Sequence, residues 1–114
     1  MANTFKNRTL RAVGTTPVDV GAAVAASTQT TLIGMTISNI VSSVISVTVT
    51  LKDSESSPGP YTTHIVKDAP IPTGGSLLVC GGDQKIVLMT GDKLIVTSNT
   101  ASSADVITSF LEIT

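Results

Sequence analysis

APIPTGGSLLVCGGDQKIVLMTGDKLIVTS, residues 69–98, is the stretch of this chain that decides the fold. It contains three short runs rich in Val, Ile and Leu, at residues 76–80, 85–89 and 93–98, and such runs are typical of β-strands. Glycine-containing turns separate them, because a tight turn often requires a positive φ that glycine adopts without steric cost. The stretch therefore predicts three consecutive strands.

The region before this stretch shows a two-residue period. Residues 28–40 and 44–52 alternate apolar with small polar side chains, which predicts strands with one buried and one solvated face. Residues 39–43 between them are expected to form a hairpin connection, and residues 67–69 to lead from an earlier strand into the deciding stretch. The apolar positions of the first strand are Ile33, Met35 and Ile37.

The end of the chain predicts a strand at residues 105–113. Ile107 and Leu111 fall on one side of it and Val106 and Phe110 on the other, so both faces are expected to be covered. A strand buried on both sides belongs in the middle of a sheet. Shorter strands are expected at residues 18–20 and 61–66.

Together these segments predict an all-β chain of eight or nine strands without a helix. Such a pattern indicates a β-sandwich, or a Greek-key or jelly-roll-like barrel. At 114 residues the chain is expected to form a single β-domain over residues 14–114, with residues 1–13 set apart from it.

The composition narrows the classes of function. Hydrophobic residues make up 41% and charged residues only 13%, so Ser and Thr supply the polar surface. A surface poor in charge suits a protein that contacts neighbours in an assembly. The net charge of −1 and the scarcity of aromatic residues argue against a nucleic-acid partner. The short apolar runs argue against a membrane partner, and a polar beginning without a leader predicts synthesis in the cytoplasm.

Residues able to do chemistry are few. His64 is the sole histidine and is expected to be structural, and Cys80, the sole cysteine, is expected to be a buried thiol. Asp83 and Asp92 each follow a glycine at a turn, where an aspartate typically bonds to its own backbone. The pattern predicts no catalytic site, no metal site and no cofactor, so the chain is not expected to be an enzyme.

Residues 1–13 (MANTFKNRTLRAV) differ from the rest because their cations have no acid among them. Two interpretations stay open. The segment is either a terminal or first strand with one solvated face, or an extended arm that reaches an acidic partner surface. In the second case the expected interaction residues are Phe5, Lys6, Arg8, Leu10 and Arg11.

The chain resembles a group of small virion structural proteins of tailed bacteriophages, especially marine phages and cyanophages. The motifs that carry the resemblance span nearly the whole chain. They are ANTFKN (2–7), GTTP (14–17), IGMTISNI (33–40), the block from KDAPIPTGG to KLIVTS (67–98) and ADVITSFLEIT (104–114).

The resemblance implies a capsid decoration, or cement, protein located in the virion. Its implied partners are the major capsid protein lattice and further copies of itself, in a homotrimer. The arm at residues 1–13 would attach by strand addition, in which backbone hydrogen bonds supply the affinity. Two alternatives stay open: a neck, tail or fibre component, and a receptor- or carbohydrate-binding module.

Overall fold

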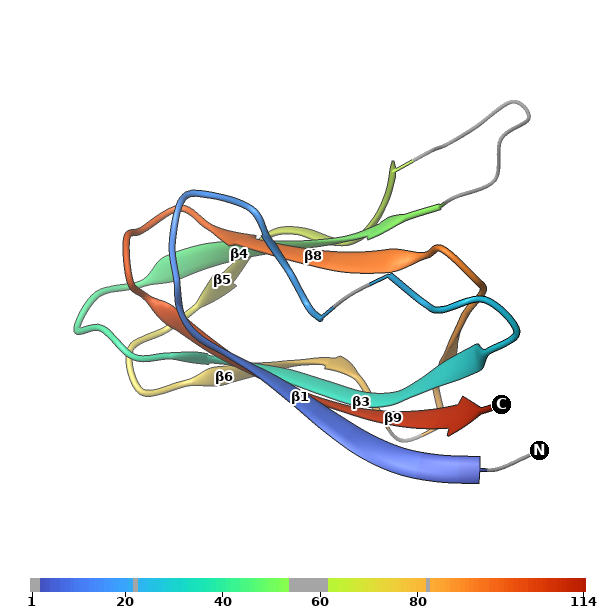
Figure 1. Ribbon diagram of the computed structural model, residues 1–114. Coiled ribbons are helices and arrows are strands. Elements are labelled where there is room, and N and C mark those ends of the chain that lie inside the picture. Colours follow the sequence, from blue (N-terminus) through green and yellow to red (C-terminus); the bar gives the residue numbers. More distant parts are fainter. Residues whose placement is uncertain (1–2, 22, 54–61, 82) are drawn as a thin grey trace.

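The computed structural model describes residues 3–21, 23–53, 62–81 and 83–114, and within these ranges the chain is all-β, with no helix. Two antiparallel sheets pack face to face as a single-domain sandwich (Figure 1), which confirms the predicted fold class. The strands are β1 (Asn3–Val13), β2 (Val18–Asp19), β3 (Gln29–Asn39), β4 (Ile45–Lys52), β5 (Thr62–Ile71), β6 (Ser76–Cys80), β7 (Ile86–Leu88), β8 (Lys93–Ser98) and β9 (Ala104–Ile113).

The strands divide between the sheets in an order that differs from their order along the chain. One sheet, called sheet A here, has the order β1-β9-β3-β6, and β7 also pairs with β3. The other, sheet B, has the order β2-β8-β4-β5. The three strands predicted in the deciding stretch are confirmed as β6, β7 and β8. They do not pair with one another, because β6 and β7 each pair with β3 in sheet A while β8 joins sheet B.

The predicted alternation holds in β4, where Ile45, Val47 and Val49 are fully buried. In β3 it is wrong at Ile33, which is only half-buried, because a β-bulge lies between Leu32 and Gly34. A bulge places one extra residue in a strand and so shifts the phase of every side chain before it. Leu32 therefore joins the core in place of Ile33.

Two predicted connections differ from the structure. The segment between β3 and β4 crosses from sheet A to sheet B, so the hairpin expected at residues 39–43 is wrong. Residues 67–69, expected to be a lead-in, belong to β5, which continues through Pro70 as an edge strand. An edge strand tolerates proline because its outer N–H needs no partner strand. Asp68 has a positive φ of 50°, and its backbone N–H donates to Thr48 Oγ1 at 3.1 Å.

The last strand, β9, lies between β1 and β3, so its predicted central position is confirmed. The expectation that both of its faces are covered is wrong. Val106 and Phe110 face the core, whereas the side chain of Ile107 is 52% exposed. The reason is that sheet B covers only one face of sheet A.

The core lies between the two sheets. Its largest fully buried side chains come from both of them and include Phe110 and Met35 from sheet A and Ile45 and Leu94 from sheet B. Asn39, at the end of β3, is a buried polar exception. Its Nδ2 donates to the backbone oxygens of Ser43 at 2.8 Å and Ile71 at 3.0 Å. Among the described residues, every buried side-chain nitrogen or oxygen has a hydrogen-bond partner.

The segment at residues 1–13, predicted to be either a first strand or an extended arm, forms an edge strand over residues 3–13. β1 pairs antiparallel with β9 along its length, from Asn3 opposite Ile113 to Val13 opposite Ala104. A bulge before Val13 places Ala12 at a φ of 51°, and the Ala12 N–H donates to Asp105 Oδ1 at 2.9 Å. Val13 is buried, so the end of this strand belongs to the core.

Candidate interaction surface

The residues considered for catalysis or metal binding, His64, Cys80, Asp83 and Asp92, do not form a common site in the structure. His64 is exposed on β5, opposite Thr50, and the described residues contain no group of three His, Cys, Asp or Glu side chains that could hold a metal ion. Asp92 Oδ2 accepts a hydrogen bond from the Met89 N–H at 2.9 Å, which confirms its predicted role in the turn. Asp83 is exposed. None of the described segments forms a helix with the length and apolar character that crossing a membrane requires.

Cys80 is a buried free thiol, as predicted, and is 1% exposed. Its Sγ lies 3.6 Å from the Leu32 carbonyl oxygen and 3.4 Å from that of Gln84. Burial raises the pKa of this thiol, because the low-dielectric surroundings disfavour the thiolate. The thiolate is the reactive form, so Cys80 is poorly placed to act as a nucleophile.

Two of the five interaction residues predicted in β1 are cations that the fold itself engages. Lys6 Nζ lies 2.9 Å from Glu112 Oε1, and Arg8 Nη2 lies 3.5 Å from Glu112 Oε2. Arg8 also donates to the Val20 backbone oxygen at 3.3 Å, and its guanidinium lies 5.1 Å from the centre of the Phe110 ring. Residues 1–13 contain no acidic residue, and Glu112 of β9 is the acidic partner of these two cations.

The other three residues of that set differ in exposure. Leu10 is half-buried and packs against the core, so its role is structural. Phe5 is 75% exposed, and Arg11 is exposed. Of the five, Phe5 and Arg11 are the two that are exposed and take part neither in the core nor in the Glu112 ion pairs.

The outer face of sheet A, turned away from sheet B, gathers most of the large exposed apolar side chains. We call it the outer A face. Side chains directly opposite each other in paired strands point to the same side of a sheet, so the register assigns its members. One row across the strands runs from Phe5 through Leu111 and Thr31 to Val87, which is 63% exposed.

A second row on the outer A face runs parallel to the first. It passes from Thr9 through Ile107 and Thr36 to Leu78, which is 66% exposed. Between the two rows lies a third, made of the smaller residues Asn7, Ser109 and Gly34. The face therefore has two apolar ridges with a lower strip between them.

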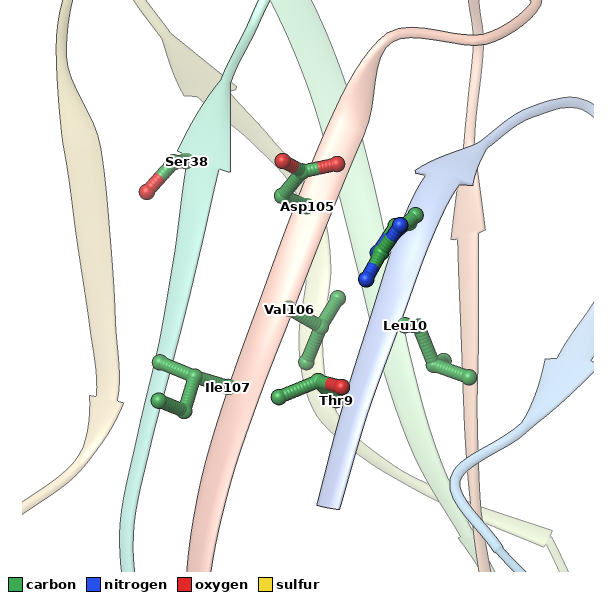
Figure 2. Close-up of a pocket in the computed structure, with 7 residues that line it drawn as sticks. Thr9, Leu10, Ser38, Asp105, Val106 and Ile107 are labelled. Carbon is green, nitrogen blue, oxygen red and sulfur yellow. The ribbon is translucent and has the colours of Figure 1, made fainter. Parts of the chain in front are cut away.

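Charge is nearly absent from the outer A face. Among the described residues, its ionisable side chains lie at one end, where the register places Asp105 and where Arg11 lines the same pocket. Figure 2 shows Asp105 together with Ser38, Thr9 and Ile107 around a pocket of about 290 Å³ at that end of the sheet. Because Asp105 also accepts the Ala12 N–H, its carboxylate has a local partner.

The outer face of sheet B, called the outer B face, is polar. Its central strand β4 presents Ser and Thr side chains and ends at Lys52. Lys93 Nζ lies 3.5 Å from Asp19 Oδ2, which places an ion pair on this face. The exposed side chain of His64 is also on this side.

No family model matches the chain, and the curated proteins contain no significant match to it. Among solved structures, the chain is similar to a Bacillus endospore appendage from a family of disulfide-linked pili. The TM-score is 0.55 and the identity 11%, and the match covers 99% of this chain and 87% of that one.

The chain is also similar to a chain of the T13 particle of infectious bursal disease virus. The TM-score is 0.55 and the identity 10%, and the match covers 96% of this chain and 35% of that one. For the T=1 particles derived from that virus the TM-score is 0.52 and the identity 10%, with 95% and 35% covered. The chain thus spans about a third of the viral chains. At these identities the likeness establishes a shared fold.

Proposed function

We propose that this chain is a structural protein of a tailed-phage virion, namely a capsid decoration protein that binds the major capsid protein lattice and stabilises it. The sequence resemblance to small phage virion proteins supports this role. The sandwich fold is compatible with it, since it also occurs in a viral particle and in a pilus. A homotrimer is the oligomer that the resemblance implies.

The observation that carries the proposal is the position of β1 at the end of sheet A. This eleven-residue strand pairs with β9 on one side, and its other edge has no neighbouring strand among the described residues. An open edge of this length can accept a strand of another protein through backbone hydrogen bonds. Attachment to the capsid protein would use this edge.

The side chains of β1 refine how the attachment would work. Lys6 and Arg8 are held by Glu112, so they contribute little attraction to an acidic partner. Arg11 is exposed at the end of the strand, on the pocket that Figure 2 shows. We therefore assign the electrostatic part of the attachment to Arg11.

Binding of the purified protein to capsids that lack it tests the proposal. Arg11→Glu is expected to weaken co-sedimentation with the shells by roughly tenfold, because a charge reversal at an interface costs on the order of 1–2 kcal/mol. Lys67→Glu, an exposed charge reversal on β5 in sheet B, is the control and should bind as the wild type does. Equal binding of the two variants would contradict the assignment.

Cryo-electron microscopy of the particle tests the location. The proposal expects many copies spread over the capsid surface. Copies confined to the neck, tail or fibres would overturn the decoration role in favour of the tail component.

A further inference from the structure

We infer that the outer A face is the contact through which two copies of this chain pair, face to face, about a twofold axis. This inference goes beyond the proposed attachment to a shell and does not depend on it. Attachment uses the backbone edge of β1 and the Arg11 side chain at one end of the outer A face, whereas pairing uses the exposed apolar side chains across that face.

The outer A face presents large exposed apolar side chains. Phe5, Leu78, Val87 and Ile107 are between 52% and 75% exposed and belong to β1, β6, β7 and β9 of sheet A, with threonines of β3 between them. Scattered exposed apolar residues are normal, but a contiguous group on one flat face marks a contact site. Four such side chains on one face therefore indicate a surface that a binding partner covers.

The distribution of charge on this face limits what can cover it. The face is uncharged except at one end, where Asp105 and Arg11 line the pocket, and the Asp105 carboxylate is bonded to the Ala12 N–H. A partner with a charged surface would lose hydration there without gaining an ion pair. A second copy of the same face brings apolar side chains against apolar side chains and adds no unpaired charge to the centre.

The area of the outer A face also matters for pairing. A ten-residue strand such as β9 is about 34 Å long, and four strands side by side span about 19 Å, so the face covers about 600 Å² before side-chain relief is added. Specific complexes bury roughly 600–1,000 Å² on each partner. The outer A face is thus at the lower end of the size that a pair requires.

Symmetry limits how copies of the chain can meet. Contact between two copies of the same patch is isologous and closes as a twofold pair, whereas a threefold ring needs two different complementary patches. The other large exposed apolar residues of the described chain, Ile40, Val44 and Met89, lie outside the strands. They do not form a second face for the outer A face to meet. The pairing therefore differs from the trimer that the resemblance implies.

The shape of the face suits stacking of this kind. The two apolar ridges are separated by the lower strip that contains Ser109 and Gly34, so side chains of one copy can settle into the strip of the other. Sheets A and B already pack in this manner inside the chain, as aligned sheets about 10 Å apart usually do.

Sedimentation velocity of the purified chain tests the inference. Between about 1 µM and about 100 µM the wild type should shift from the 11.6 kDa mass of one chain to the mass of two. Leu78→Lys combined with Ile107→Lys should weaken pairing by at least about 100-fold, because it buries two charges on each side of the contact. Val44→Lys, at a position of 61% exposure outside the strands, is the matched control and should pair normally.

Circular dichroism and the thermal midpoint establish that each variant is folded. If the double variant does not fold, Leu78→Lys alone replaces it, since that side chain is 66% exposed in the single chain. A wild type that keeps the mass of one chain throughout, a mass of three chains, or a lysine variant that pairs like the control would overturn the inference. A wild type that pairs in solution but does not bind capsids would contradict the proposed function and leave the pairing intact.

Discussion

The outer A face and the outer B face belong to two sheets that share one core, yet they differ in what they show to the solvent. On the outer A face, two ridges that include Phe5, Leu78, Val87 and Ile107 stand exposed and uncharged. On the outer B face, serine and threonine alternate with the buried residues, and Lys93 pairs with Asp19. Most of the exposed apolar surface of the described chain therefore lies on one side of the sandwich, the outer A face.

The difference has a structural cause in β1. Its two cations with ion-pair partners, Lys6 and Arg8, are opposite Phe110 and Thr108 in the register, so they point to the inner side. Glu112 of β9 holds both of them there. The residues of β1 that the register places on the other side, such as Phe5 and Asn7, are uncharged, so the charges of the outer A face are confined to the end where Arg11 and Asp105 lie.

The largest effect is expected from the two sides of β9. Phe110→Ala, at a side chain 1% exposed, should lower the free energy of unfolding by about 3–5 kcal/mol, because it leaves a cavity in the core. Ile107→Ala, on the outer A face of the same strand, should cost less than about 1 kcal/mol in the single chain. Denaturant unfolding at low protein concentration measures both. A cost for Ile107 similar to that for Phe110 would mean that the outer A face stabilises the fold of the single chain and is not kept for a partner.

A smaller effect is expected where the chain leaves sheet A for sheet B. Asn39→Asp replaces a donor to two backbone oxygens, of Ser43 and Ile71, with an acceptor, and should cost about 2–3 kcal/mol. Asn99→Asp is the matched control. Asn99 Oδ1 accepts the Ser46 N–H at 3.0 Å, and a carboxylate can accept it equally well. Chemical denaturation compares the two, and an equal cost would show that Asn39 does not tie the sheets together.

The smallest effect on stability is expected at Glu112. Glu112→Gln removes the charge that holds Lys6 and Arg8 and should cost about 0.5–1 kcal/mol, less at high salt, because partly exposed ion pairs are weak and screened. Thermal midpoints at low and high salt measure the cost. A cost that is the same at both salt concentrations would mean that these ion pairs do not stabilise the chain.

The sequence predicted the fold class because strict alternation, as in β4, requires only local information. It did not predict the bulge at Ile33 or the continuation of β5 through residues 67–69, since a bulge depends on the partner strand. The sequence also could not predict that β6 and β7 join one sheet and β8 the other. Alternation of apolar and polar residues shows which side chains of a strand are buried, but not which strand pairs with it.

The candidate surface was predictable only in part. Phe5 and Arg11 were among the residues predicted from the sequence, and both are exposed. The pairing of Arg8 with Glu112, 104 residues away, had no local signal. Ile107 was expected to be covered because apolar residues occupy both sides of β9, and a sequence does not tell a buried apolar side chain from one left exposed for a partner.

Thiol labelling at one position on each outer face tests the central claim most directly. Ser109→Cys lies in the low strip of the outer A face and His64→Cys on the outer B face, and both native side chains are exposed. Cys80 gives a low background because its thiol is buried and its pKa is raised. As the protein concentration rises through the pairing range, labelling of Ser109→Cys should slow at least about tenfold while His64→Cys keeps its rate, because contact excludes the reagent. Equal labelling rates at both positions across that range would contradict the account.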